Sequence, residues 1–403
     1  MTAQMTPLGD LRHKVVRDLC WVLGSAHLLG AQAGAPLLDD GWCQTIVARS
    51  AAWLRDLDAE PEPLLAFVRA QRGRARLGHY VAALLEYWLH ASPELRASRL
   101  ITGARLEAEG GADLGQLKYL FTTDAEAGIG GAPRVVTHWE LHVKFFLYMP
   151  PEPVCAALGA PRAAQLVTPD SAARAEDALL DRFVGPFVGE TLLDRTRILS
   201  HRLTMGRARA LHHWLGDQLG ARVDVRSAGV LRGTLFYPLG DAELAPAHAA
   251  AAGIVGARHA RGWYCDDLAL ALDSFAGCKW ALPRGEGSGK LHWLAPSRAR
   301  AAERGGPLQI AGVESLGIGA VDVLDRAEMA PIAAAALARD GGTPVLLLAL
   351  RRARPMGTEG TVGAAAEDTA EATDAVMADE WIECSRGFVP VSYTHLTLPT
   401  KRI

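Results

Sequence analysis

The sequence lacks the features that mark secreted, membrane-spanning or zinc-binding proteins. Its six cysteines are scattered, with no Cys-x-x-Cys or Cys-x-x-His pair, so neither a zinc site nor a disulfide framework is indicated. No apolar run approaches the roughly 20 residues that a membrane helix needs, and residues 1–18 carry charges without the apolar core of a signal peptide. We therefore expect reduced thiols, a cytoplasmic location and no membrane partner.

An excess of charge of one sign is also missing. Lys and Arg together number 42 and Asp and Glu 45, which gives a net charge of −3. This balance neither indicates nor excludes a nucleic-acid partner, because a local basic groove is compatible with a balanced total. The 403 residues, 49% of them hydrophobic, suffice for two or three domains with a sizeable core, and no internal repeat is visible. Nothing here predicts an oligomeric state.

Hydrophobic spacing predicts an α/β protein with three regions. Residues 1–75 form a helical N-terminal region that includes one amphipathic helix over 41–57. Residues 76–240 form an α/β core, and residues 241–390 an α+β extension with a flexible insertion near 356–378. The last residues, 391–403 (VSYTHLTLPTKRI), resemble a translated sequencing adapter, so the natural C-terminus beyond about residue 390 stays open.

The core region predicts the order helix, three strands, helix, strand, with a second strand after the last. The ranges are a helix over 78–90, strands over 100–106, 115–121 and 135–148, a long helix over 192–219, and strands over 222–226 and 229–238. In the extension we expect a helix over 263–275 and strands over 279–282, 290–294 and 344–350. Residues 285–290 (GEGSGK) lack the spacing of a phosphate-binding loop and predict a hairpin turn instead.

Chemistry-bearing side chains gather in the stretch 115–148. Its two strand patterns flank a glycine-rich turn, which predicts a β-hairpin. Alternation along the second strand places four ionisable side chains on one face: His138, Glu140, His142 and Lys144. Gln116 and Lys118 share a face of the first strand in the same way.

Short motifs over most of the chain resemble DUF1853, an uncharacterised bacterial family. The most specific is His138-Trp139-Glu140-Leu141 followed by Val143-Lys144-Phe145. Others are Val16–Leu19, Gly233–Pro238, Trp293–Pro296 and Arg386–Val389. This resemblance implies a family but no activity.

The predicted core order also looks like the PD-(D/E)xK nuclease superfamily. There, carboxylates hold Mg²⁺ and a lysine helps to activate water or to steady the phosphate, and a hard divalent ion is suited to both oxygen ligands and phosphodiester chemistry. The resemblance implies that Glu140 is a metal ligand, that Lys144 is the catalytic lysine, and that Glu86 is an auxiliary acid. An active member would be a Mg²⁺-dependent phosphodiesterase or nuclease.

Two departures from that pattern argue against efficient cleavage. Where the pattern runs Gly-Glu-Leu-Asp, this chain has Gly115-Gln116-Leu117-Lys118, so both acids of the second core strand are replaced and a lysine adds repulsion. Glu140 and Lys144 are four residues apart, which separates their Cα atoms by about 13 Å at about 3.3 Å per residue. Their convergence on one ion would need a bulge or a bend.

Four interpretations of the Glu140 face stay open. It is the solvated face of an edge strand with a weak Glu140–Lys144 pair, a nuclease-type pocket without metal chemistry, a working metal-dependent nuclease, or a transition-metal site at His138 and His142. Arginines at 72–76 and on the long helix are suited to line a phosphate-binding groove. These include Arg76, Arg195, Arg197, Arg202, Arg207 and Arg209.

The leading hypothesis is a nuclease-like core that binds nucleic acid or nucleotide with impaired metal-dependent cleavage. Its candidate site residues are Gln116, Lys118, Glu140 and Lys144, with Glu140 and Glu86 as ligands if a divalent ion binds. The alternative is a protein-interaction or scaffold module with no nucleic-acid role. Basic charge concentrated beside the Glu140–Lys144 face favours the first hypothesis, whereas an exposed apolar patch without a basic groove favours the second.

Overall fold

A computed structural model describes thirteen stretches of the chain. They are residues 9–71, 76–107, 111, 113–123, 133–149, 175–186, 190–240, 253–283, 288–301, 306–310, 320–339, 344–353 and 380–389. The predicted insertion at 356–378 and the tail at 391–403 lie outside these residues, as does most of the predicted turn between the two hairpin strands.

Helices precede and follow the hairpin in the order that the spacing predicts. The N-terminal helices are α1 (Lys14–Gly24), η1 (Ala31–Ala33), α2 (Asp40–Arg49), α3 (Ala51–Ala59), α4 (Glu62–Ala70) and α5 (Leu77–Ala91). The later ones are α8 (Ala175–Leu180), α9 (Leu192–Met205), α10 (Arg209–Leu219), α12 (Leu268–Asp273), η3 (Ser288–Trp293) and α13 (Arg326–Arg339).

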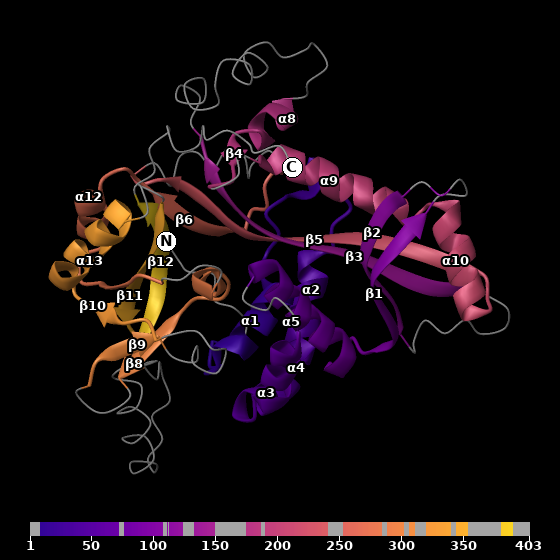
Figure 1. Ribbon diagram of the computed structural model, residues 1–403, viewed down its shortest axis with the longest axis horizontal. Coiled ribbons are helices and arrows are strands. Elements are labelled where there is room, and N and C mark those ends of the chain that lie inside the picture. The colour runs from indigo at the N-terminus through magenta and orange to yellow at the C-terminus, as the bar shows by residue number, and fades with distance from the viewer. Residues whose placement is uncertain are drawn as a thin grey trace, which may run out of the picture.

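The strands of the described residues join in one mixed sheet. They are β1 (Ala97–Glu107), β2 (Asp113–Thr123), β3 (Arg134–Tyr148), β4 (Phe183–Val184), β5 (Val223–Pro238), β6 (Ala260–Tyr264), β7 (Lys279–Ala281), β8 (Arg298–Ala301), β9 (Leu308–Ile310), β10 (Val323–Leu324), β11 (Val345–Arg352) and β12 (Trp381–Val389). The main path runs β1-β2-β3-β5-β6-β12-β11-β7-β10. Figure 1 shows α1–α5 on one side of the central strands, with α9 and α10 on the other.

The hairpin and the helix before it are confirmed. β2 and β3 pair in antiparallel fashion, with Tyr119 opposite Trp139 and Phe121 opposite Thr137. α5 buries Tyr80, an apolar residue of the predicted face, against the N-terminal helices and this hairpin. Aromatic and aliphatic residues at helical spacing on α5 and at alternate positions on β3 therefore meet in one core, as the periodicity predicts.

His138, Glu140 and His142 on β3 are buried, so the interpretation of its polar face as solvated is wrong. On one side β3 pairs with β2 at Thr137–Trp139, and on the other it runs parallel to β5, from Arg134 beside Val223 to Leu147 beside Phe236. β5 is a single strand where the sequence predicted two. β5 lies far from β3 in the sequence. Parallel strands joined by a long crossover carry no signal of their pairing in the hydrophobic periodicity of either strand.

The predicted long helix over 192–219 is two helices, α9 and α10, separated at Gly206. A Cβ atom at this glycine would lie 1.9 Å from Ser227 Oγ and 3.1 Å from His138 Nδ1, so the end of α9 closes directly onto the sheet. Residue 206 can lie this close to His138 and Ser227 only because glycine has no side chain. α9 begins with a capping box between Thr191 and Asp194, in which each side chain accepts from the other's backbone N–H.

Three other predicted elements differ from the structure. The helix over 41–57 is broken at Ser50 into α2 and α3. The helix over 263–275 is the end of β6 followed by the shorter α12, and the strand over 290–294 is replaced by the 3₁₀ helix η3. Because Ala-rich and short aromatic segments suit either period, tertiary packing decides between them.

The sheet continues across the predicted boundary at residue 240, since Thr234–Pro238 of β5 pair in parallel with Ala260–Tyr264 of β6. The division of the chain into three regions stays a prediction. None of the helices among the described residues has the length and apolar run that a bilayer crossing requires.

Candidate functional site

The sequence places a carboxylate, Glu140, in the centre of β3, where it is completely buried. Its Oε1 accepts the backbone N–H of Lys118 at 2.9 Å and lies 3.4 Å from His138 Nε2. Its Oε2 lies 3.3 Å from Arg202 Nη1 and 3.7 Å from His142 Nε2. Strands β2 and β3 and helix α9 thus supply the groups around one buried anion.

The two histidines on either side of Glu140 are oriented by partners of their own. His138 Nδ1 lies 3.0 Å from Ser227 Oγ on β5. Arg195 Nη1 donates to His142 Nδ1 at 3.3 Å, which leaves the Nε2–H of His142 facing Glu140. The arginine thus fixes the tautomer of His142, whose Nε2 faces Glu140 beyond hydrogen-bond distance, whereas the Ser227 hydroxyl can donate to His138 or accept from it.

The net effect of burial and nearby charges is to lower the pKa of both Glu140 and His142. Burial raises the pKa of Glu140, but contact with His138 and His142, the N–H of Lys118 and its charge outweigh burial and hold that pKa well below its usual range. Burial lowers the pKa of His142 to about 4, and the charges of Lys118 and Arg195 add to the effect. At neutral pH the carboxylate is therefore charged and His142 is neutral.

A cavity of about 560 Å³ opens beside this buried group, bounded by α5, β2, β3, α9 and η3. Six cationic side chains from these elements and their flanks line it: Arg76, Lys118, Lys144, Arg195, Arg202 and Lys290. Among the described lining residues the one carboxylate is Glu190. The volume is in the range typical of small-ligand sites, and the excess of positive charge selects for an anion.

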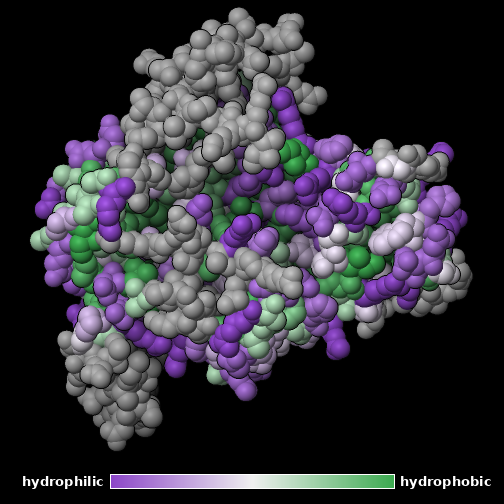
Figure 2. All heavy atoms as spheres, viewed as in Figure 1, coloured by the Kyte–Doolittle hydropathy of each residue, from purple (hydrophilic) through white to green (hydrophobic). Residues whose placement is uncertain are grey.

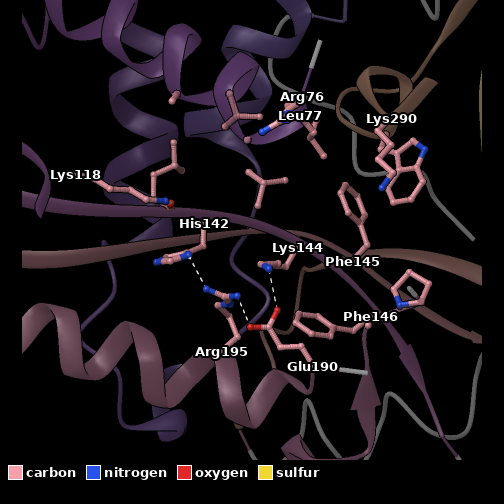
Figure 3. A pocket seen from close by; sticks show the side chains of 18 of the residues that line it. Arg76, Leu77, Lys118, His142, Lys144, Phe145, Phe146, Glu190, Arg195 and Lys290 are labelled. Atoms are coloured by element: carbon pink, nitrogen blue, oxygen red, sulfur yellow. Dashed lines mark hydrogen bonds and ion pairs between the residues drawn. The ribbon is translucent and has the colours of Figure 1, made fainter. Parts of the chain in front are cut away.

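Glu190 is held between two of the cations. Lys144 Nζ lies 2.8 Å from its Oε2, and Arg195 is paired with its Oε1. Figure 3 shows Lys144 and Arg195 directed at this carboxylate from β3 and α9, while Arg76 and Lys290 lie across the cavity from it. Lys144 and Arg195 together bind one carboxylate here. The same two cations are therefore suited to bind an anionic group of a ligand.

Lys118 reaches the cavity from β2, and its Nζ donates to the backbone carbonyl of Leu141. Burial lowers the pKa of Lys118 to about 8; the charge of Glu140 opposes the shift, and the charges of Arg202 and Arg195 add to it. The ammonium group of Lys118 thus loses its proton more readily than that of an ordinary lysine.

Apolar side chains form the rest of the cavity wall. Phe145 meets Trp293 of η3 edge-on, with ring centroids 4.7 Å apart, and Tyr119 donates to the carbonyl of Ala82 on α5 at 3.2 Å. Lys290 lies 5.7 Å from the centroid of the Trp293 ring. A pocket with cations on opposite sides and an apolar, aromatic wall suits an organic anion better than a bare inorganic ion.

The structure brings together three of the four predicted site residues. Lys118 and Lys144 line the cavity, and Glu140 lies beneath it. Gln116 is exposed on β2, where its side-chain amide donates to the carbonyl of Gly103 on β1 at 2.9 Å, and it does not line the cavity. Glu86 is half-buried on α5 and is not a lining residue either.

The residues present do not fit a Mg²⁺ ion. Magnesium requires oxygen ligands, whereas Glu140 is surrounded by two imidazoles, an arginine and a backbone N–H. Within the described stretches no group of three or more His, Cys, Asp or Glu side chains is placed to hold a metal ion. His138 and His142 each direct Nε2 at Glu140, at 3.4 Å and 3.7 Å respectively.

Some site residues followed from sequence patterns and others did not. Of the arginines expected to line a phosphate groove, Arg76, Arg195 and Arg202 reach the cavity. Arg197 instead pairs with Asp177, and Arg72 and Arg74 lie outside the described residues. Sequence reasoning missed Glu190, Lys290 and Trp293; for Lys290 the signal was a Gly-rich, lysine-bearing segment that had been assigned to a hairpin turn.

Comparison with known proteins gives one match. A family described as Domain of unknown function (DUF1853) matches residues 17–315, about three-quarters of the chain. No curated protein and no solved structure matches this chain.

Proposed function

The chain belongs to the DUF1853 family, and we propose that its cavity binds nucleic acid or nucleotide through phosphate, without efficient metal-dependent cleavage. The observation that carries this proposal is the excess of cations: six line the cavity, against Glu190 in its lining and the buried Glu140 beneath it. This is the concentration of basic charge beside the Glu140–Lys144 face that distinguishes a phosphate-binding protein from an interaction module.

The order of elements around the cavity supports a nuclease-like core. Helix α5 is followed by β1, β2 and β3 and, after α8 and β4, by α9, α10 and β5, which lies parallel to β3. Under this proposal, Glu140 and Lys144 of β3 and Lys118 of β2 correspond to the active-site positions of that superfamily. We also propose that the protein is of bacterial origin and lies in the cytoplasm, as expected from the sequence.

Lys118 accounts for the loss of metal chemistry. Its ammonium group supplies a positive charge next to Glu140 at the strand position where a metal-binding acid would stand. Phosphate binding in this cavity accordingly needs no divalent ion, and we expect it to survive removal of metals by a chelator.

The alternative, a scaffold or protein-interaction module, has less support. The large hydrophobic side chains that are exposed among the described residues lie on separate elements: Trp42, Leu114, Ile198 and Leu270. Figure 2 shows apolar residues on this face as separate small areas among hydrophilic ones. Among the described residues visible on this face in Figure 2, no continuous apolar surface suggests a protein partner.

Removing one cavity cation should weaken the binding of a phosphate-bearing ligand. For Arg195→Gln and for Lys144→Gln we expect the dissociation constant for a nucleoside 5′-monophosphate to rise about 10- to 100-fold, since a hydrogen bond to a charged group contributes about 1.5–3 kcal/mol. Fluorescence titration or calorimetry at fixed salt measures it, with the unphosphorylated nucleoside as a ligand control.

Arg197→Gln is the matched control for this experiment. Arg197 lies on the same helix, α9, but pairs with Asp177 outside the cavity. Its substitution should leave the dissociation constant within about twofold. Equal weakening by Arg195→Gln and Arg197→Gln, or no binding by the parent protein even at low salt, contradicts phosphate binding in this cavity.

A cleavage assay with Mg²⁺ and with Mn²⁺ tests the lapsed nuclease site. We expect no metal-dependent cleavage of DNA or RNA by the parent chain, and a gain of cleavage when Gln116→Glu and Lys118→Asp are combined, because the second-strand acids are then restored. Lys118→Asp alone shows whether Gln116, whose side chain bonds to Gly103, contributes. Cleavage by the parent at the rate of the double variant contradicts the proposal.

A further inference from the structure

Lysine is rare in this chain, and half of the lysines line the cavity. The sequence has six lysines: Lys14, Lys118, Lys144, Lys279, Lys290 and Lys401. Three of them, Lys118, Lys144 and Lys290, line the cavity on different elements, as Figure 3 shows. Because the remaining cations are arginines, a primary amine is concentrated at this site, and an amine can do covalent chemistry that a guanidinium cannot.

The three cavity lysines have different surroundings. Lys144 is paired with Glu190, and Lys290 lies over the ring of Trp293. Lys118 Nζ donates to the neutral carbonyl of Leu141, and within the described residues no carboxylate oxygen forms an ion pair with that nitrogen. Burial, helped by the charges of Arg202 and Arg195 and opposed by that of Glu140, lowers the pKa of Lys118, and only the uncharged amine is a nucleophile.

We propose that Lys118 is the nucleophile of this cavity and forms an imine with the carbonyl carbon of a phosphate-bearing aldehyde. The inference rests on the phosphate binding proposed above, since the phosphate would be held at Arg195, Lys144 and Arg202 while the carbonyl meets the amine. Anchoring of one end of the ligand makes the attack effectively intramolecular.

The step balances without an added oxidant or reductant. Lys118 Nζ attacks the carbonyl carbon, a C–N bond forms, and the oxygen becomes the hydroxyl of a carbinolamine. The C–O bond then breaks, and both hydrogens of the neutral amine leave with that oxygen as water. The product is a C=N bond between Lys118 and the ligand, which water can hydrolyse again.

Pyridoxal 5′-phosphate is a suitable probe because it carries an aldehyde and a phosphate. The full chain is incubated with the probe near pH 8 and treated with borohydride, which reduces the imine to a stable secondary amine. Peptide mass spectrometry then locates the label among the six lysines. We expect Lys118 to carry most of the label, at least tenfold more than Lys279, and a nucleoside 5′-monophosphate to protect it.

Two variants and one ligand control make the result decisive. Lys118→Arg keeps the charge and should lose the label, whereas Lys279→Arg, remote from the cavity and paired with Asp325 in the parent, should leave the labelling of Lys118 unchanged. Pyridoxal without phosphate should label Lys118 at least tenfold less. Labelling of Lys144 or Lys290 in preference, or equal labelling of the described lysines, overturns the inference.

The two proposals fail in different ways. If nucleotide binds and is weakened by Arg195→Gln but Lys118 stays unlabelled, the nucleophile is wrong and phosphate binding stands. If Lys118 is labelled equally by pyridoxal and by pyridoxal 5′-phosphate, and nucleotide does not protect it, phosphate binding is wrong and the inference, which requires a phosphate-bearing ligand, falls with it.

Discussion

Replacing Glu140 by alanine is expected to lower the free energy of unfolding by about 3–5 kcal/mol. The carboxylate is completely buried and stands between Lys118, Arg202 and two histidines. Removing it leaves positive charges close together in a region of low polarity, and leaves the N–H of Lys118 without its acceptor. Urea unfolding monitored by circular dichroism measures the loss.

Two further variants separate charge from packing in this experiment. Glu140→Gln keeps an oxygen that can accept from Lys118 and should cost less than alanine. Glu107→Ala, at an exposed position on β1, should change stability by no more than about 0.5 kcal/mol. A loss below 1 kcal/mol for Glu140→Ala would show that Glu140 does not hold the cations of β2 and α9 in place.

Acidification is expected to unfold the protein between about pH 6.5 and pH 4. Burial lowers the pKa of His142 and of His259 to about 4 and that of His292 to about 3, and it holds the pKa of His27 well below 6.5. In this range the unfolded chain binds protons that the folded chain refuses. Stability therefore rises with pH through the window and is lost as pH falls through it.

The expected magnitude is large because four groups act together. Each buried histidine contributes at most about 1.4 kcal/mol per pH unit, against a total stability of about 5–15 kcal/mol for an ordinary domain. Urea unfolding at pH 7, 6 and 5 measures the slope. A free energy of unfolding that is constant over this range contradicts the buried, neutral state of these histidines.

His292 offers the sharpest variant for this measurement. Its side chain is completely buried in η3, and neither ring nitrogen has a hydrogen-bond partner among the described residues. Besides burial, the charges of Lys14 and Arg386 lower its pKa. His292→Leu should reduce the slope of stability against pH, whereas His79→Leu, at an exposed position on α5, should leave the slope as it is.

Local periodicity accounts for the parts of the fold that the sequence predicted. The helix ending near His90, the hairpin of β2 and β3, and the alternation that sets Glu140 beside His138 and His142 all depend on neighbours within a few residues. The breaks at Ser50 and Gly206 were missed because each depends on what lies across from the helix, such as Ser227 beneath Gly206.

The sequence by itself determined which chemistry is on β2 and β3. It showed an acid and two histidines on one strand face, a lysine in place of an acid at 118, and arginines suited to phosphate. Only the tertiary structure decided that Glu140 is buried and that Glu190 and Lys290 join the cavity. The reason is that β5, α9 and η3 come from distant parts of the chain, and burial depends on what packs against a strand, which no local pattern records.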